Sequence, residues 1–123
     1  KKGIADRVEF AGWGSDPETY LNRADLLIFP TRWQEPFGLG GLEALARGLP
    51  VAAFRLGGVE DWLPDSAGYS VPEGDTAALA RAIESHTRDA AIRMSANAVR
   101  FVRQNFSRER FLNSIRSLME NVK

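Results

Sequence analysis

The sequence contains no cysteine, which excludes disulfide frameworks, thiolate metal sites and cysteine nucleophiles. It has no excess of either charge, because 16 Lys and Arg residues balance 16 Asp and Glu residues. Nucleic-acid-binding proteins usually carry a basic excess, so we expect no nucleic-acid partner. The longest apolar run, Leu26 to Pro30, is far shorter than the ~20 residues that span a bilayer. These absences favour a cytoplasmic protein.

What the sequence does contain is typical of one globular domain. A chain of 123 residues suffices for one core and is too short for two. It begins with Lys1-Lys2-Gly3 and enters a strand pattern almost at once, which suggests a piece of a larger protein. We expect a single partial domain over residues 1–123, with the sheet and the ligand site in 1–75 and C-terminal helices in 76–123.

Four short segments read as strands: Val8–Phe10, Asp25–Pro30, Val51–Phe54 and Tyr69–Val71. The second is a nearly continuous apolar run, typical of a parallel strand covered on both faces. Helical patterns separate these segments. The alternation predicts an α/β fold, with a Rossmann-like, mostly parallel sheet and flanking helices.

Helix starts are marked by residues whose side chains cap a first turn. The predicted caps are Asp16, Asp75, Asp89 and Ser107. One further helix runs from near Gly38 to Gly48, where a glycine followed by Pro50 is a termination signal. Its three- and four-residue spacings predict a buried stripe of Leu39, Leu42, Leu45 and Ala46.

Two loops leave the carboxyl ends of predicted strands, where ligands bind in open parallel sheets. They are residues 31–37 and 55–60. The helix after the first loop opens on Gly38-Leu39-Gly40-Gly41, and the free N–H groups and dipole of such a helix start favour a phosphate. Alternatively, the glycines only let the helix pack close to its strands. Spacing alone does not decide between the two interpretations.

Two glutamates flank this helix start. Glu35 lies in the loop, where a carboxylate can accept hydrogen bonds from sugar hydroxyls. Glu43 lies about one turn into the helix, within reach of a ribose beyond the phosphates. From the residues alone, a solvated helix position is slightly favoured for Glu43. Against that, it is the lone charge beside Ala44, Leu45 and Ala46.

These residues meet a family pattern. Glu35–Leu39, followed by Leu42–Val51, closely resembles the donor-site motif of GT-B-fold glycosyltransferases of family 4, in which seven residues separate two glutamates. Gly40-Gly41 departs mildly from the larger residues often found there. The resemblance covers about residues 3 to 106, and flanking segments agree at Val8–Gly12, Ala24–Thr31, Gly57-Gly58 and Gly68–Val71.

The resemblance implies a role for each position of the motif. Glu35, the expected catalytic residue, would contact hydroxyls of the donor sugar. Backbone N–H groups near Phe37, Gly38 and Leu39 would hold sugar and diphosphate. Glu43 would bind the ribose, and Thr31 would line the pocket.

The same resemblance implies a retaining hexosyltransferase that uses a UDP- or GDP-linked sugar without a cofactor or bound metal. The chain would be part of a GT-B C-terminal domain lacking its first strands, which in this fold lie between the Val8 and Leu26 strands. An N-terminal acceptor domain would be missing, together with the family's phosphate-binding Arg and Lys. The intact parent would be cytoplasmic or membrane-peripheral, and the isolated chain would not turn over. Bare strand edges suggest the absent portion or a second copy as a partner.

Two other functions remain open. The chain is alternatively a non-catalytic nucleotide-sugar-binding or interaction module, such as one half of a two-chain enzyme. A GT-B-type epimerase is a less favoured alternative, because the glutamate motif fits the transferases better.

Some residues outside the motif have a plain and a functional interpretation. A surface position is favoured over phosphate binding for Arg55. Trp33 either stacks at the pocket mouth or packs. We expect His86 at the surface and Glu60 and Asp61 in the first turn of a helix.

Overall fold

The computed structural model describes residues 3–14 and 16–122. In this part of the chain, three parallel strands form one sheet in the order β1 (Leu27–Phe29), β2 (Val51–Arg55) and β3 (Gly68–Pro72). Leu27 is in register with Val51, and Val51 with Gly68. The predicted α/β fold with a parallel sheet is therefore confirmed.

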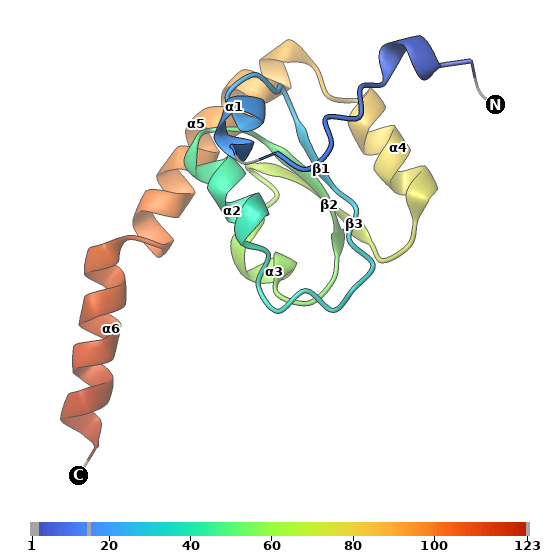
Figure 1. Ribbon diagram of the computed structural model, residues 1–123. Coiled ribbons are helices and arrows are strands. Elements are labelled where there is room, and N and C mark those ends of the chain that lie inside the picture. Colours follow the sequence, from blue (N-terminus) through green and yellow to red (C-terminus); the bar gives the residue numbers. More distant parts are fainter. Residues whose placement is uncertain (1–2, 15, 123) are drawn as a thin grey trace.

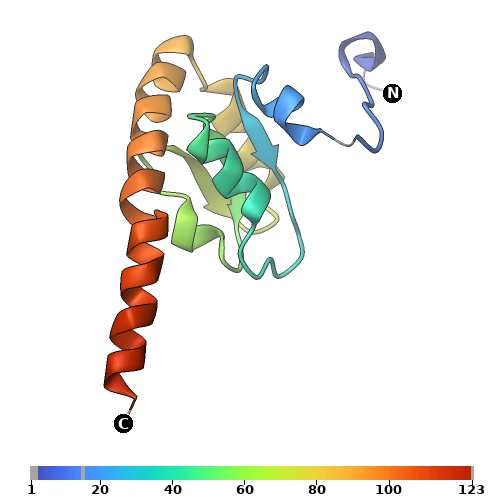
Figure 2. The same cartoon turned by 60° about the vertical axis from the view of Figure 1, so that its left-hand side comes forward.

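Helices cover the sheet on both faces (Figure 1). Helices α2, α3 and α5 pack on one face of the sheet, and α4 packs on the other. The last helix, α6, continues beyond the end of α5 and extends away from the sheet (Figure 2). The helices are α1 (Pro17–Leu21), α2 (Leu39–Ala46), α3 (Val59–Trp62), α4 (Thr76–Glu84), α5 (Arg88–Asn105) and α6 (Arg108–Asn121), preceded by a 3-10 turn at Ala5–Arg7.

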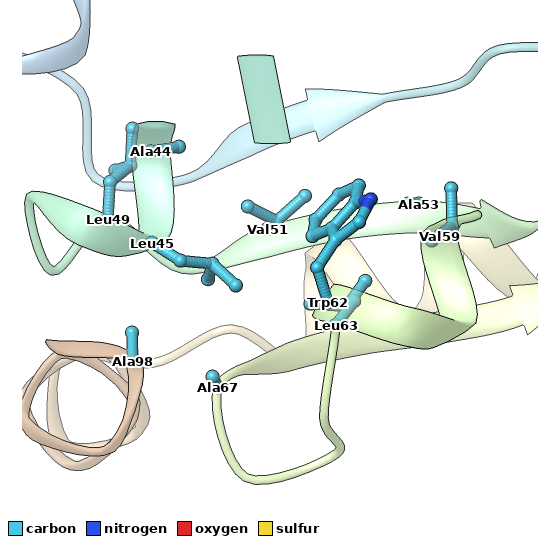
Figure 3. Packing of buried hydrophobic residues seen from close by; sticks show 10 residues of the cluster. All are labelled: Ala44, Leu45, Leu49, Val51, Ala53, Val59, Trp62, Leu63, Ala67 and Ala98. Atoms are coloured by element: carbon cyan, nitrogen blue, oxygen red, sulfur yellow. The ribbon is translucent and has the colours of Figure 1, made fainter. Parts of the chain in front are cut away.

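The central strand β2 separates two apolar clusters because successive side chains point to opposite faces. Val51 and Ala53 enter the larger cluster, between α2, α3 and α5 (Figure 3). Ala52 and Phe54 enter the smaller cluster, where they meet Leu79 of α4. β2 is therefore the strand that is covered on both faces, as a parallel strand in such a fold should be.

Three of the four predicted helix caps are confirmed. The side chains of Asp16, Asp75 and Ser107 accept hydrogen bonds from backbone N–H groups in the first turns of α1, α4 and α6. The cap predicted at Asp89 is wrong, because the hydroxyl of Thr87 accepts the bond from the Ala90 N–H and α5 begins at Arg88. A Thr in an extended conformation two residues earlier is an equally local cap.

The strand predicted at Val8–Phe10 is wrong. These residues form no strand and are exposed, as are all the described residues up to Gly14. A strand needs a neighbour that takes up its backbone hydrogen bonds, and in the described residues β1 pairs with β2 alone. The sequence pattern alone does not supply that neighbour.

The sequence predicted that β1 is covered on both faces, and this prediction is wrong. Ile28 is 46% exposed, although its register partner Ala52 is buried beneath α4. Helix α4 packs on β2 and β3, which leaves this face of β1 open. Among the described residues, no helix combines the length and the apolar character needed to cross a bilayer.

Candidate functional site

The two loops singled out in the sequence are in backbone contact at the carboxyl edge of the sheet. The Gly58 N–H donates a hydrogen bond to the Glu35 carbonyl, with 2.8 Å between nitrogen and oxygen. A Cβ on Gly57 would overlap the backbone of Glu35, and one on Gly58 would lie 2.5 Å from the Pro36 carbonyl oxygen. Glycine is therefore required where the loops cross. The prediction that both loops lie at one edge is confirmed.

Helix α2 starts directly behind the first loop. Its N-terminal cap, Gly38, has φ 90°, a left-handed conformation that favours glycine. No side chain caps the helix. The N–H groups of Leu39 and Gly40 lie in the first turn, where a helix offers no internal acceptor. This is the geometry of an uncapped, positively polarised helix end.

The glycines at the start of α2 play different parts. A Cβ on Gly41 would overlap the indole ring of Trp62, so this glycine is needed for close packing, as the plainer interpretation held. A Cβ on Gly40 would meet nothing closer than 3.9 Å, so packing does not require glycine there. The close-packing explanation therefore accounts for Gly41 and leaves Gly40 without a structural explanation.

The buried stripe of α2 differs from the one predicted. The buried residues are Gly41, Ala44 and Leu45, whereas Leu39 is 66% exposed and Ala46 is exposed. The helix buries the side that faces α3, β2 and α5, and it turns Leu39 outward. Its first turn is thereby accessible from solvent.

The two glutamates of the motif lie in different elements, Glu35 in the first loop and Glu43 on α2. Glu35 is half-buried in the loop, and its Cγ lies within 3.3 Å of a Cβ position on Gly38. Glu43 is exposed on α2. Among the described residues, neither carboxylate is in an ion pair. Arg47 bonds instead to the Glu43 carbonyl and to the Glu18 side chain.

Thr31 and Phe37 define the two ends of the first loop. Thr31 is half-buried, and its hydroxyl lies 3.4 Å from the Trp33 N–H, which donates to it. The Phe37 ring packs edge-on against Phe106, the residue that follows α5, with 5.9 Å between the ring centroids. Its carbonyl accepts a hydrogen bond from the Trp62 indole N–H. The carbonyl and the side chain of Phe37 therefore both anchor the loop to the fold.

Trp62 is a residue of this site that the sequence interpretation missed. It is fully buried beside Val51 and Ala53 (Figure 3). Its partner Phe37 is 25 residues upstream, so no local spacing links the two. The sequence contained a single signal for this role, namely a bulky aromatic residue about one helical turn after the Gly57-Gly58 loop.

The second loop ends in a small polar cluster. The Arg55 guanidinium donates to the Ser70 carbonyl at 3.3 Å and lies 3.5 Å from the Glu60 carboxylate. The Arg55 side chain is 51% exposed. The favoured interpretation of Arg55 as a surface residue agrees with this geometry, in which it joins β2, β3 and α3. Glu60 and Asp61 lie in the first turn of α3, as predicted.

His86 is half-buried, whereas Trp33 is exposed. The prediction of a surface His86 is wrong, because its half-buried ring bridges the Tyr69 hydroxyl at 3.1 Å and the Asp25 carbonyl at 3.3 Å. Asp25 and Tyr69 lie near the amino ends of their strands, at the edge opposite the site. Trp33 is 83% exposed, so it does not pack into the core of the described residues.

An open apolar groove of about 740 Å³ borders the site. Phe37, Leu39 and Leu42 form the wall from the first loop and α2. Phe106, between α5 and α6, and Phe111 of α6 form the opposite wall. The groove therefore shares Leu39 with the exposed start of α2.

Comparison with known proteins identifies a family. A family model described as "Glycosyl transferases group 1" matches residues 1–89. The chain is 33% identical over 123 residues to the lipopolysaccharide core biosynthesis mannosyltransferase LpcC of Rhizobium leguminosarum bv. viciae. That match covers 98% of this chain and 35% of the relative. The chain thus spans about a third of the length of this relative.

Solved structures agree with the fold. A sucrose-phosphate synthase from Thermosynechococcus elongatus superposes with a TM-score of 0.80 at 31% identity, over 97% of this chain and 31% of that one. Anabaena HepE, solved in complex with UDP, superposes with a TM-score of 0.81 at 26% identity, over 98% of this chain and 34% of that one. The three strands and their helices thus match part of larger proteins.

Proposed function

Because this chain belongs to the glycosyl transferases group 1 family, we propose that it is the donor-binding part of a retaining glycosyltransferase. The reaction would move a hexose from a UDP- or GDP-linked sugar to an acceptor such as a saccharide or a lipid-linked glycan. The observation that carries the proposal is the contact between the loops at Glu35 and Gly58, directly beside the uncapped start of α2.

Each group at the carboxyl edge of the sheet has a proposed role that matches its charge. The N–H groups of Gly38 and Leu39, with the positive end of α2, hold the diphosphate. Glu35 accepts hydrogen bonds from hydroxyls of the donor sugar, and Glu43 accepts them from the ribose. Thr31 lines the pocket. Protein groups balance the phosphate charge in this scheme, so no bound metal is needed.

Full turnover would require more than this chain. The lysines of the sequence are Lys1, Lys2 and Lys123, so the described residues offer no lysine for the phosphates. We propose that the first strands of this domain, which precede Lys1 in the parent, supply the remaining phosphate contacts and pair with the free edge of β1, and that a separate N-terminal domain binds the acceptor. The isolated chain then binds donor without transferring sugar, and the intact parent works in the cytoplasm, at most peripherally on a membrane.

A titration of the length-complete parent protein with UDP, GDP and ADP tests the site. We expect binding of UDP or GDP, and Glu43→Ala should weaken it about tenfold, the loss of one strong hydrogen-bonding group. Glu84→Ala is the matched control, because Glu84 is an exposed glutamate on α4. The ribose role is rejected if Glu43→Ala binds as tightly as the wild type. The donor site itself is rejected if no nucleotide binds.

Glu35→Gln separates the two ends of the ligand. It should weaken binding of the sugar nucleotide and leave binding of the free nucleoside diphosphate unchanged, because Glu35 faces the sugar in this proposal. Equal weakening of both ligands would contradict that role.

A further inference from the structure

Trp62 is the largest fully buried side chain of the described residues. The other two tryptophans differ sharply, since Trp13 is fully exposed and Trp33 is 83% exposed. Trp62 comes from the short helix α3, immediately after the glycines that touch the Glu35 loop. A side chain of this size at this place has two sets of contacts with the start of α2.

The first set is steric. A Cβ on Gly41 would overlap the six-membered ring of Trp62, and one on Gly38 would lie 3.1 Å from its Cζ2 and Nε1 atoms. Gly38 and Gly41 are three residues apart and therefore lie on one side of the first helical turn. The indole fills the space that these two glycines leave open.

The second contact is polar. The indole Nε1–H donates a hydrogen bond to the Phe37 carbonyl. A buried indole N–H requires an acceptor, and this carbonyl belongs to the peptide that leads into Gly38. In a trans peptide the C=O and the N–H point in opposite directions. A Phe37 carbonyl that faces Trp62 therefore turns the Gly38 N–H away from the core.

We propose that Trp62 is a positioning residue, which fixes the Phe37–Gly38 peptide so that the Gly38 N–H is aimed at a phosphate of the nucleotide. This inference rests on the proposed function, and it gives the buried indole a role beyond filling the core. The rival explanation is that Trp62 contributes packing alone.

Two variants separate positioning from packing. Trp62→Phe keeps an aromatic ring and removes the N–H donor, at some cost in packing. Adding Gly41→Ala refills part of the space with a methyl group, at a helical position where alanine is favoured over glycine. The double variant G41A/W62F should therefore recover stability without recovering the donor. Trp13→Phe is the matched control, because Trp13 is fully exposed.

The readouts are the urea midpoint of unfolding and the dissociation constants of UDP and GDP, measured on the same preparations. Trp62→Phe should lower the midpoint and weaken binding. G41A/W62F should return the midpoint most of the way and still bind about tenfold more weakly than the wild type, the effect of one lost hydrogen bond to a charged group. Trp13→Phe should change neither quantity.

The alternatives give different results. If affinity returns together with stability in G41A/W62F, the indole acts through packing alone and the positioning role is overturned. If the wild type itself binds neither nucleotide, the proposed function fails, and the phosphate role of Trp62 fails with it. A binding defect that persists in a restabilised protein supports the proposal.

Discussion

The Gly58 N–H donates a hydrogen bond to the Glu35 carbonyl across 2.8 Å. This bond joins two loops that leave neighbouring strands of the sheet. It therefore ties the half-buried carboxylate residue of the first loop to the glycine pair of the second. The candidate site depends on a backbone contact that tolerates no side chain on either glycine.

Gly58→Ala should separate the loops. Its Cβ would lie 2.5 Å from the Pro36 carbonyl oxygen and 2.8 Å from the Phe37 Cα, which are backbone atoms that cannot rotate away. We expect a loss of about 1–3 kcal/mol in the free energy of unfolding, as for overpacked cores, together with weaker nucleotide binding. Gly14→Ala is the control, since a Cβ there meets only the Tyr20 ring at 3.6 Å. Urea unfolding that is unchanged in Gly58→Ala would contradict the requirement for glycine.

Leu45 and Leu118 offer the same substitution in two environments. Leu45 is 0% exposed between α2 and the sheet, whereas Leu118 on α6 is 63% exposed. Leu45→Ala should cost about 2–5 kcal/mol through lost burial and a cavity. Leu118→Ala should stay within about 0.5 kcal/mol. Equal losses in the two variants would mean that α6 is packed against another surface in solution.

Features that depend on neighbouring residues, such as helix caps, were predictable from the sequence. Contacts between segments far apart in the chain were less predictable. The caps at Asp16 and Asp75 need only N–H groups two or three residues away, so spacing identifies them. The exposure of Ile28 depends on where α4 packs, and α4 begins far downstream in the chain, at Thr76. The fit between Gly41 and Trp62 likewise depends on the tertiary fold. The sequence thus predicted that the two loops lie at one edge of the sheet, and missed the Trp62 side chain beneath them.

Asp16 should titrate below the ordinary range of an aspartate. A hydrogen bond from the Thr19 hydroxyl, and others from the Glu18 and Thr19 backbone, lower its pKa from 3.8. Because the folded pKa lies below the unfolded value, the cap stabilises the fold above about pH 4, and this contribution is lost as the pH falls through the folded pKa. Thr19→Val should raise the pKa of Asp16 toward 3.8, measured by an NMR titration of the carboxyl carbon. A midpoint that does not move would mean that the hydroxyl is not the main cause.

Tyr69→Phe tests whether the two edges of the sheet are independent. The Asp25 carbonyl can only accept, so the His86 Nε2 must carry a proton, and Nδ1 of the neutral ring accepts from the Tyr69 hydroxyl. Removing that hydroxyl leaves Nδ1 without its donor and should cost about 0.5–1.5 kcal/mol in urea unfolding. Nucleotide affinity should not change, because Tyr69 and His86 lie at the edge opposite the Glu35 loop. Tyr20→Phe, at a half-exposed ring, should be neutral in both measurements. If Tyr69→Phe weakened nucleotide binding while Tyr20→Phe did not, the two edges of the sheet would be coupled.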